Sequence, residues 1–359
     1  MIILDKTDRD MLNMMFNDIR KQNVDISRHM KVSTYGSDVL VFSAWNGNSL
    51  TYMRPLKKNE RLDNPFMLDY NAVRIRKAKP KDSVVVNPGV KEYTVILNGI
   101  SIESFGLDIE DFPEMLNTTG EVSVGPIEVT AEKLLTLLPG MSRDASRTIL
   151  NGYCFKEDSM FCTDGRVLHA TKVDVDAEAN KEGFVLIQTD SNFLRIPANI
   201  KRLGGDTKMT VSVQAEGGQV SSHPAKQIVF SVRHNSGAWT FMFIHKNIHG
   251  VPPNFKQVVP DESQGVNLKF TPKEVEQLST LPKEYENLRF NSCITSNSAG
   301  IPISVPLETS TKFKTACSRT RLLSICQAGV LEFKQADGDS PLHADHNGYK
   351  FVLMPMRLE

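Results

Sequence analysis

The residues best able to hold a metal lie near the carboxyl end of the chain, where His343, Asp345 and His346 stand close together. Imidazole nitrogens and carboxylate oxygens are ordinary zinc ligands, but a zinc site needs three or four ligands that converge from fixed positions. No HExxH pair accompanies these residues. We therefore expect no metal site and no catalytic metal.

The cysteines are the next candidates for chemistry. There are five of them, an odd number, and no two form a CxxC pair. This usage is typical of reduced thiols in a cytoplasmic protein. Cys154 and Cys162 fall in strand-like runs, where a buried and inert thiol is the expected role.

Signatures of the common enzyme classes are missing from the sequence. It contains no GxxxxGK[ST] phosphate loop, no GxGxxG after a strand-like run and no GxSxG turn. We therefore expect no catalytic residues, no cofactor and no enzymatic activity. An enzyme of an unrelated class stays open as an alternative, which a cofactor bound to the purified protein would favour.

Composition sets broad limits on the elements that could position a site. The chain has 359 residues, with 42 Lys and Arg against 42 Asp and Glu, so its formal net charge is zero. Such a composition is typical of a globular protein of two or three domains, and it argues against binding nucleic acid through overall basicity. No apolar run is long enough for a membrane span or a signal peptide, so we expect a cytoplasmic protein.

A strand-to-helix pattern occurs three times along the chain, beginning at Ile2, Ile127 and Leu268. In each copy, alternating apolar residues run into apolar residues at helical spacing. Polar residues suited to cap the three helices are Asp5, Thr130 and Thr271, and Pro272 suits a first helical turn.

Further features recur at similar offsets. Short helix-like segments are expected at Met67–Lys77, Phe193–Leu203 and Thr320–Ala328, and proline-containing acidic stretches at Asp108–Met115 and Val251–Glu262 look like links. A repeat of this length indicates duplicated domains. The sequence predicts three α+β repeats, with the boundaries 1–122, 123–264 and 265–359.

Residues 143–173 read RDASRTILNGYCFKEDSMFCTDGRVLHATKV. The pattern predicts a polar loop, a strand through Leu150, a strand through Phe161 and a tight turn at Thr163-Asp164-Gly165. This segment resembles the second domain of the bacterial DNA polymerase III beta subunit, the beta sliding clamp, whose motifs are Arg-x-x-Leu-Asn-Gly and Thr-Asp-Gly-His-Arg-Leu. The residues that match are Arg147, Leu150, Asn151, Gly152, Thr163, Asp164, Gly165 and Leu168.

Two further stretches are similar to the same family. NFKQVVP (Asn254–Pro260) resembles the link after its second domain, and MPMRL (Met354–Leu358) resembles its carboxyl terminus. The chain also departs from the family pattern, since Arg166-Val167 replaces His-Arg and Pro139-Gly140 ends a helix early. It therefore resembles a divergent member, such as one carried by a phage or mobile element.

The resemblance implies an α+β fold of three clamp domains, with sheets outside and two helices of each domain inside, in a ring-shaped homodimer. Such a ring encircles duplex DNA and tethers the replicative polymerase as a processivity factor. Partners would be double-stranded DNA without sequence preference, and a DNA polymerase and an ATP-dependent clamp loader that bind through short peptide motifs. A clamp-fold binding platform for repair or transcription partners is the alternative.

The resemblance also assigns roles to residues. The partner-peptide pocket would use Leu150, Thr163, Gly165, Arg166, Leu168, Pro253, Gln257, Val258, Ser340, Pro341, Val352, Met354, Pro355, Met356 and Arg357. The candidates for phosphate contact are Arg20, Lys21, Arg74, Arg76, Lys77, Lys79, Lys81, Arg143, Lys201 and Arg202. The dimer interface would bring Ile102 of an edge strand to Leu278 and Leu281 of a helix. A neutral chain would then carry positive charge inside the ring and negative charge outside.

Overall fold

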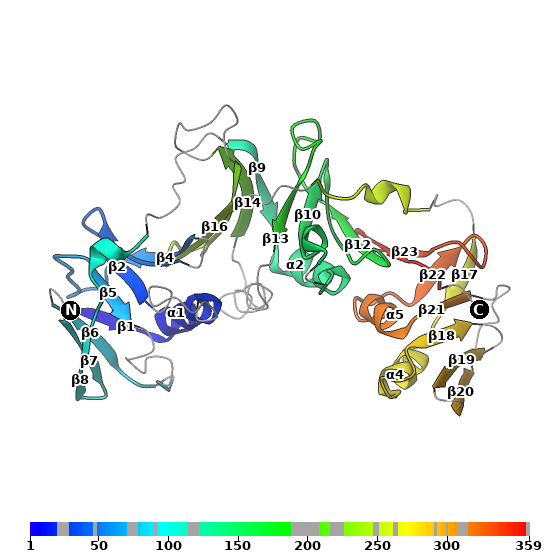
Figure 1. Cartoon of the computed structure of the whole chain (residues 1–359), viewed down its shortest axis with the longest axis horizontal. Coiled ribbons are helices and arrows are strands. Elements are labelled where there is room, and N and C mark those ends of the chain that lie inside the picture. Colours follow the sequence, from blue (N-terminus) through cyan, green and yellow to red (C-terminus); the bar gives the residue numbers. More distant parts are fainter. Residues whose placement is uncertain are drawn as a thin grey trace. The chain divides into compact units, whose positions relative to one another are not determined.

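The structure of the chain is a computed structural model, drawn in Figure 1. It describes residues 1–19, 29–45, 49–69, 78–79, 81–89, 92–113, 122–144, 146–187, 208–215, 226–246, 251–260, 265–290, 293–298, 301–306 and 315–356. Contacts divide the chain into two compact units. Compact unit 1 comprises Met1–Ala131 and Thr189–Asn247, and compact unit 2 comprises Glu132–Gln188 and Ile248–Glu359.

Compact unit 1 holds a four-stranded sheet in the order β1-β6-β7-β8 and an eight-stranded sheet in the order β5-β2-β3-β4-β16-β15-β14-β9. The four-stranded sheet contains β1 (Ile2–Leu4), β6 (Val84–Pro88), β7 (Glu92–Leu97) and β8 (Ile100–Phe105). The eight-stranded sheet contains β2 (His29–Tyr35), β3 (Val39–Trp45), β4 (Ser49–Pro55), β5 (Phe66–Asp69), β9 (Val122–Val129), β14 (Lys208–Ala215), β15 (Lys226–Arg233) and β16 (Thr240–Lys246).

Compact unit 2 has the same plan. Its eight-stranded sheet runs β13-β10-β11-β12-β24-β23-β22-β17, and its four-stranded sheet runs β20-β19-β18-β21. The larger sheet contains β10 (Gly152–Lys156), β11 (Ser159–Thr163), β12 (Val167–Lys172), β13 (Phe184–Ile187), β17 (Val266–Lys269), β22 (Glu332–Gln335), β23 (Leu342–His346) and β24 (Tyr349–Leu353). The smaller sheet contains β18 (Asn287–Phe290), β19 (Cys293–Ser298), β20 (Ile301–Pro306) and β21 (Thr315–Ser318).

The strand order repeats with a period of eight strands along the described chain. The groups β1-β6-β7-β8 and β5-β2-β3-β4 return as β9-β14-β15-β16 and β13-β10-β11-β12, and again as β17-β22-β23-β24 and β21-β18-β19-β20. Each eight-stranded sheet joins two such groups, through β4 with β16 and through β12 with β24. The predicted α+β fold of three repeated domains is confirmed, and the exact domain boundaries stay a prediction.

The strand-to-helix starts agree with the sequence pattern. In α1 (Lys6–Ile19), the amide of Asp8 donates to Asp5 Oδ1 (2.9 Å) and the amide of Asp5 donates to Asp8 Oδ2 (3.1 Å). α4 (Pro272–Thr280) begins with a capping box between Thr271 and Glu274. These reciprocal bonds satisfy amides that have no partner within a helix.

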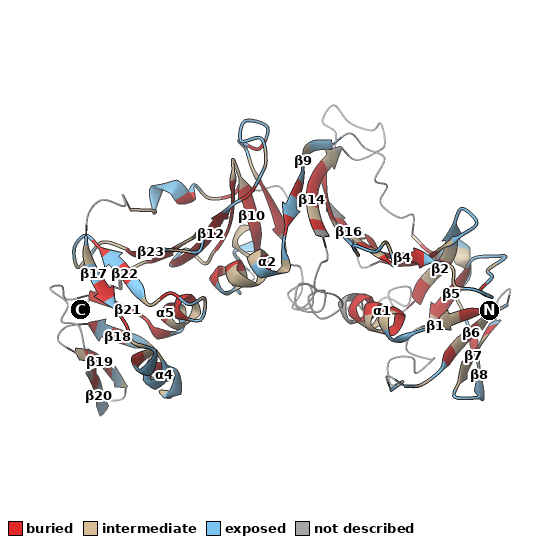
Figure 2. Ribbon diagram, turned by 180° about the vertical axis from the view of Figure 1, so that it is seen from behind, coloured by how far each residue is buried: buried red, intermediate tan, exposed pale blue. Residues whose placement is uncertain are grey.

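The helices place their apolar faces on the sheets (Figure 2). Met11, Leu12 and Met15 of α1 are buried. α2 (Ala131–Leu137) passes at Leu138 into the single 3₁₀ turn η4 (Leu138–Gly140), so the helix ends early at Pro139-Gly140, as the sequence predicted. In compact unit 2, α4 and α5 (Arg319–Cys326) pack over a core that includes Leu278 and Leu322.

Two expectations about elements were wrong. Phe66–Asp69 is strand β5, paired with β2, so no helix begins at Met67. Leu150 lies in the 3₁₀ turn η5 (Thr148–Leu150), and the strand after it begins at Gly152. The expected second helices at 70–77 and 193–203 lie outside the described residues, whereas α5 confirms the third one. Among the described helices, none is long and apolar enough to cross a membrane.

Candidate functional site

The Thr163-Asp164-Gly165 turn connects β11 to β12 and is held by its own polar atoms. The Thr163 hydroxyl donates to the carbonyl of Val167 (2.7 Å) and accepts from the amide of Gly165 (3.0 Å). Asp164 Oδ1 accepts from the amides of Arg166 (2.8 Å) and Val167 (2.9 Å). Gly165 has φ +85°, a backbone conformation that a residue with a Cβ adopts at a cost. The turn is therefore a locally determined and rigid element.

The carboxyl-terminal tail runs beside this turn. β24 pairs with β12, so that Val352 lies opposite Leu168. Beyond the strand, the amide of Met354 donates to the carbonyl of Arg166 (2.8 Å). The amide of Met356 donates to the carbonyl of Ala316 in β21 (2.7 Å). Two predicted pocket segments, the turn and the tail, are thus fixed against each other.

The linker that contains the 3₁₀ turn η7 (Phe255–Gln257) packs on the same sheet through Phe255. The Phe255 ring lies 4.5 Å from the Phe161 ring, measured between centroids. The apolar cluster beneath the linker consists of Cys154, Phe161, Leu168, Ala170, Val185, Phe255 and Val352, with Ile149, Val259 and Met354 at its margin. The structure therefore brings the linker, β12 and the tail together, as the resemblance implies.

The predicted pocket residues differ in exposure. Leu168 and Val352 are buried beneath the surface, where they can form a floor. The residues that are exposed are Gly165, Arg166, Gln257 and Val258. Those that are half-buried are Leu150, Thr163, Pro253, Ser340, Pro341, Met354, Pro355 and Met356. Arg357 lies outside the described residues.

Ser340 is connected to β21, the strand that binds the tail, through the side chain of Gln335. Gln335 Nε2 donates to the carbonyl of Ser340 (2.8 Å) and to the hydroxyl of Thr315 (3.2 Å). Thr315 is the neighbour of Ala316, which binds the tail. Ser340 is therefore linked to the tail indirectly, by way of Gln335 and strand β21.

Charged groups that the sequence analysis did not assign surround the turn. Asp164 Oδ2 accepts a hydrogen bond from Nε of Arg321 in α5 (2.7 Å) and forms an ion pair with Nη2 of the same guanidinium (2.7 Å). Arg147 Nη1 donates to the carbonyl of Asp164 (3.3 Å), and its Nε lies 3.6 Å from Asp144. Hydrogen bonds from the Ser146 hydroxyl and amide lower the pKa of Asp144. Arg321 carries no local sequence signal, because its partner is far away in the chain.

His169 lies on the face of β12 opposite to the one that carries Leu168. Its Nδ1 is 2.9 Å from the carbonyl of Thr136, and its Nε2 is 3.4 Å from the hydroxyl of Ser324 in α5. The Phe351 ring meets it edge-on at 5.0 Å. Burial lowers the pKa of His169, because charge is costly in this surrounding.

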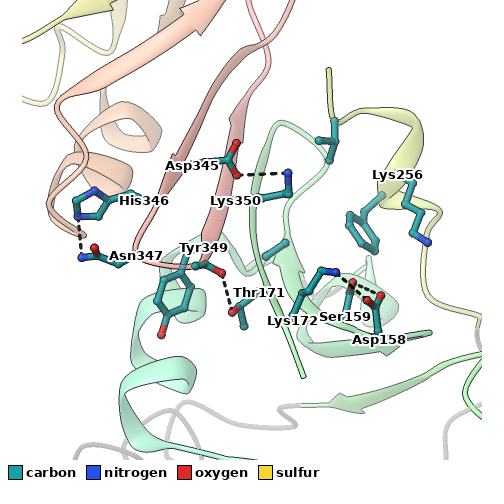
Figure 3. A pocket seen from close by; sticks show the side chains of 14 residues that line it. Asp158, Ser159, Thr171, Lys172, Lys256, Asp345, His346, Asn347, Tyr349 and Lys350 are labelled. Carbon is teal, nitrogen blue, oxygen red and sulfur yellow. Dashed lines mark hydrogen bonds and ion pairs between the residues drawn. The ribbon is translucent and has the colours of Figure 1, made fainter. Parts of the chain in front are cut away.

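A pocket lies at the ends of β12 and β24 that are remote from the Thr163-Asp164-Gly165 turn (Figure 3). Its volume is about 650 Å³, and its apolar wall includes Ala170, Phe255 and Val259. At its rim, Lys172 lies 3.3 Å from Asp158 and Lys350 lies 3.4 Å from Asp345. Lys256, also at the rim, forms an ion pair with Glu157.

The histidines near the tail do not form a metal site. His343 is buried, Asp345 pairs with Lys350, and His346 Nε2 lies 3.0 Å from the side-chain Nδ2 of Asn347. Within the described part of the chain, no group of three or more His, Cys, Asp or Glu side chains could hold a metal ion. The five cysteines are unpaired, and burial raises the pKa of the Cys154 thiol to about 12.

Most of the predicted DNA contacts cannot be placed. Arg20, Lys21, Arg74, Arg76, Lys77, Lys201 and Arg202 lie outside the described residues, whereas Lys79, Lys81 and Arg143 are exposed. The described helices carry both signs of charge: α1 begins with Lys6, Asp8, Arg9 and Asp10. Arg9 is buried and donates to the carbonyl of Lys79 (2.8 Å). The separation of charge between the inside and the outside of a ring stays a prediction.

The three residues predicted for the dimer interface differ in how far they are buried. Ile102 is half-buried on β8, an edge strand of its sheet. Leu278 has no exposed surface and belongs to the core of compact unit 2, so its assignment to an interface was wrong. Leu281 is half-buried and packs on that core. On the edge strands of the two four-stranded sheets, the described residues include three exposed large apolar side chains: Ile100 and Phe105 of β8 and Ile301 of β20.

The chain is similar over its whole length to solved bacterial sliding clamps. A Helicobacter pylori beta clamp bound to a DNA ligase peptide superposes with a TM-score of 0.72 at 16% identity, covering 99% of both chains. The Pseudomonas aeruginosa DNA polymerase sliding clamp gives 0.71 at 16% identity, again covering 99% of both. A Caulobacter crescentus polymerase III beta chain gives 0.67 at 22% identity, covering 98% of both.

The fold is that of a bacterial sliding clamp. No protein-family model matches the sequence, and no curated protein matches it significantly. The likeness to clamps thus rests on the arrangement of strands and helices, at identities typical of a divergent chain. The resemblance suggested by the turn and the tail is confirmed at the level of the fold.

Proposed function

We propose that the chain is a DNA sliding clamp, which encircles duplex DNA as a homodimeric ring and tethers a replicative polymerase. The observation that supports this most is the threefold strand order, repeated over the full length of a chain with the fold of solved clamps. Such a ring holds DNA by topology, so a net charge of zero is compatible with it. A tethered polymerase that dissociates stays near its primer, because its effective concentration remains high.

In this proposal the linker, the turn and the tail form the docking site for short partner peptides. The Helicobacter pylori clamp was solved with a DNA ligase peptide, so a peptide partner is reasonable for this fold. Val258 and Met354 offer apolar surface beside a rigid turn, and flexible methionines can repack around different anchors. A polymerase and an ATP-dependent loader would bind here in turn, in the cytoplasm, and the clamp itself would catalyse no reaction.

The ring would close through sheet edges. β8 and β20 are edge strands of the two four-stranded sheets, and each exposes apolar side chains. Edge strands present unpaired backbone groups that can pair with another chain. Head-to-tail contact between β8 of one copy and β20 of another would close a two-fold ring. The boundaries 1–122, 123–264 and 265–359 are our proposed domain limits.

DNA retention tests the proposal. An ATP-dependent loader from the same source first loads the protein onto nicked circular DNA. The complexes of protein and DNA are separated from free protein, and the DNA is then cut once to make it linear. A ring that holds DNA by topology stays on the circle and leaves the linear product. Equal retention on circular and linear DNA, or a light-scattering mass of 40.1 kDa instead of twice that value, would contradict it.

The tail gives a test of the docking site. Replacing Met354 and Met356 by Ala removes apolar side chains from a half-buried edge, so we expect peptide binding to weaken by at least tenfold, which corresponds to about 1.4 kcal/mol. Retention on circular DNA should not change. Fluorescence anisotropy with a labelled DNA ligase peptide measures the affinity. Unchanged peptide binding would argue against a pocket at the tail.

A further inference from the structure

One carboxylate connects the turn at the proposed site to a helix distant in sequence. Asp164 Oδ1 accepts hydrogen bonds from two backbone amides of its own turn. Its Oδ2 accepts a hydrogen bond from Arg321 Nε and forms an ion pair with Arg321 Nη2, both at 2.7 Å. The exposed fractions of the two side chains are 17% and 29%. Charge-assisted bonds that are partly shielded from water are stronger than those of exposed pairs.

Arg321 lies in the first turn of α5, and several hydrogen bonds fix this end of the helix. The Ser318 hydroxyl caps α5 by accepting from the amide of Arg321 (3.3 Å). Glu286 binds the Ser318 hydroxyl and accepts from the hydroxyl of Thr320 (2.6 Å). Arg319 is buried and donates to the carbonyl of Leu278 (3.1 Å). The guanidinium of Arg321 therefore projects from a fixed support.

These contacts connect the turn, α5, β21 and the tail in a closed loop of interactions. The turn binds α5 through Asp164 and Arg321, and α5 follows directly on β21. β21 binds the tail, because Ala316 accepts from the amide of Met356, and the tail binds the turn through Met354 and Arg166. Without the ion pair, the turn would still be held at its base by β11 and β12, and beyond them by the bond from Met354 and by Arg147, whose bond is longer (3.3 Å) and more exposed.

We propose that Arg321 is a positioning residue for the partner-peptide site: it holds the Thr163-Asp164-Gly165 turn at a fixed distance from the Met354–Met356 tail. The inference rests on the proposed function, since it concerns the same docking site. Arg321 need not touch the peptide. Without Arg321, the turn and the tail can move apart. Peptide binding must then order them again, and this costs part of the binding free energy.

Hydrogen exchange of the peptide-free protein tests the positioning directly. In Arg321→Ala, the amides of Arg166, Val167 and Met354 should exchange faster than in the original chain, while amides in the middle of β12 stay protected. Lys172→Ala is the matched control. It removes a longer and more exposed ion pair, to Asp158, at the other end of the same strand (Figure 3), where Lys172 is 81% exposed.

Peptide affinity tests the consequence for binding. With a labelled DNA ligase peptide as the probe, Arg321→Ala and Asp164→Asn should each bind about tenfold more weakly, whereas Lys172→Ala should bind as the original chain does. The double variant should bind no more weakly than either single variant, because both remove the same contact. Arg321→Lys keeps the charge and one donor group, so it should recover part of the loss.

The outcomes separate the two claims. An original chain that does not bind the peptide contradicts the proposed function, and the exchange rates still decide whether Arg321 holds the turn. If the original chain binds and Arg321→Ala binds equally well, the positioning role is overturned. If a melting curve shows that Arg321→Ala does not fold, Arg321→Lys and Asp164→Asn decide: unchanged affinity in both overturns the inference.

Discussion

His169 is the buried histidine whose surroundings predict a response to pH. Its imidazole lies between the carbonyl of Thr136 and the hydroxyl of Ser324, beside the Phe351 ring. Burial lowers its pKa in the folded state below the ordinary value of 6.5. The folded protein thus binds fewer protons than the unfolded chain at slightly acidic pH.

The free energy of unfolding should therefore be fully retained above pH 6.5 and should fall as the pH drops towards the lowered pKa. His169→Gln cannot titrate, so its stability should change less between about pH 6.5 and 5. Urea titrations of both proteins across this window measure the difference. Parallel curves for the two proteins would contradict the assignment, because the remaining histidines are common to both.

Among the elements, the junction of β1 with α1 depends on a buried charge network. Arg54 is 4% exposed and lies 2.7 Å from Asp8 and 2.6 Å from Glu60. The Tyr52 hydroxyl also donates to Asp8 (2.8 Å). Burial alone would raise the pKa of Glu60, but hydrogen bonds from Arg54 and from the amides of Lys57 and Ile3 lower it overall.

Arg54→Met should destabilise compact unit 1 by about 3–5 kcal/mol, because it leaves the buried carboxylate of Glu60 without its cation and leaves Asp8 with Lys57 (2.6 Å) as its remaining ion-pair partner. Arg61→Met is the control, since its pair with Asp63 is 82% and 65% exposed and should matter little. Chemical denaturation monitors both variants. Equal stability of the two variants would show that the network contributes no more than a surface pair.

Local elements were predictable and nonlocal ones were not. The starts of α1 and α4 follow from Asp5 and Thr271, whose bonds reach only three residues along the chain. Phe66–Asp69 was mistaken for a helix start because its state depends on pairing with Met30 and its neighbours in β2. At the site, the turn and the tail were found from their motifs, but their link through Arg321 depends on tertiary contacts that no local pattern records.

For the whole molecule, the edge strand β8 carries the prediction about assembly. Ile100 and Phe105 are 68% and 69% exposed on this strand. Changing both to Lys should shift the light-scattering mass towards 40.1 kDa, because lysines on an edge strand oppose pairing with another chain. Folding of the monomer should not suffer, as both side chains point into solvent.

Tyr35→Lys is the control for this experiment, since Tyr35 is 74% exposed at the end of β2, away from β8. It should leave the mass unchanged. A dimer that survives the double change in β8 would mean that this edge is not the interface.

The strands that join repeats also govern how the chain can fold. Met53 pairs with Thr240, and Leu168 pairs with Val352, so each large sheet is completed only by residues made much later in synthesis. Until then β4 and β12 are open edges, which favours slow folding and association between incomplete chains. A fragment that ends at a repeat boundary should aggregate unless the missing strands are supplied as a second fragment. Although the repeats look like separate domains, we expect that none of them folds completely without the strands of its neighbour.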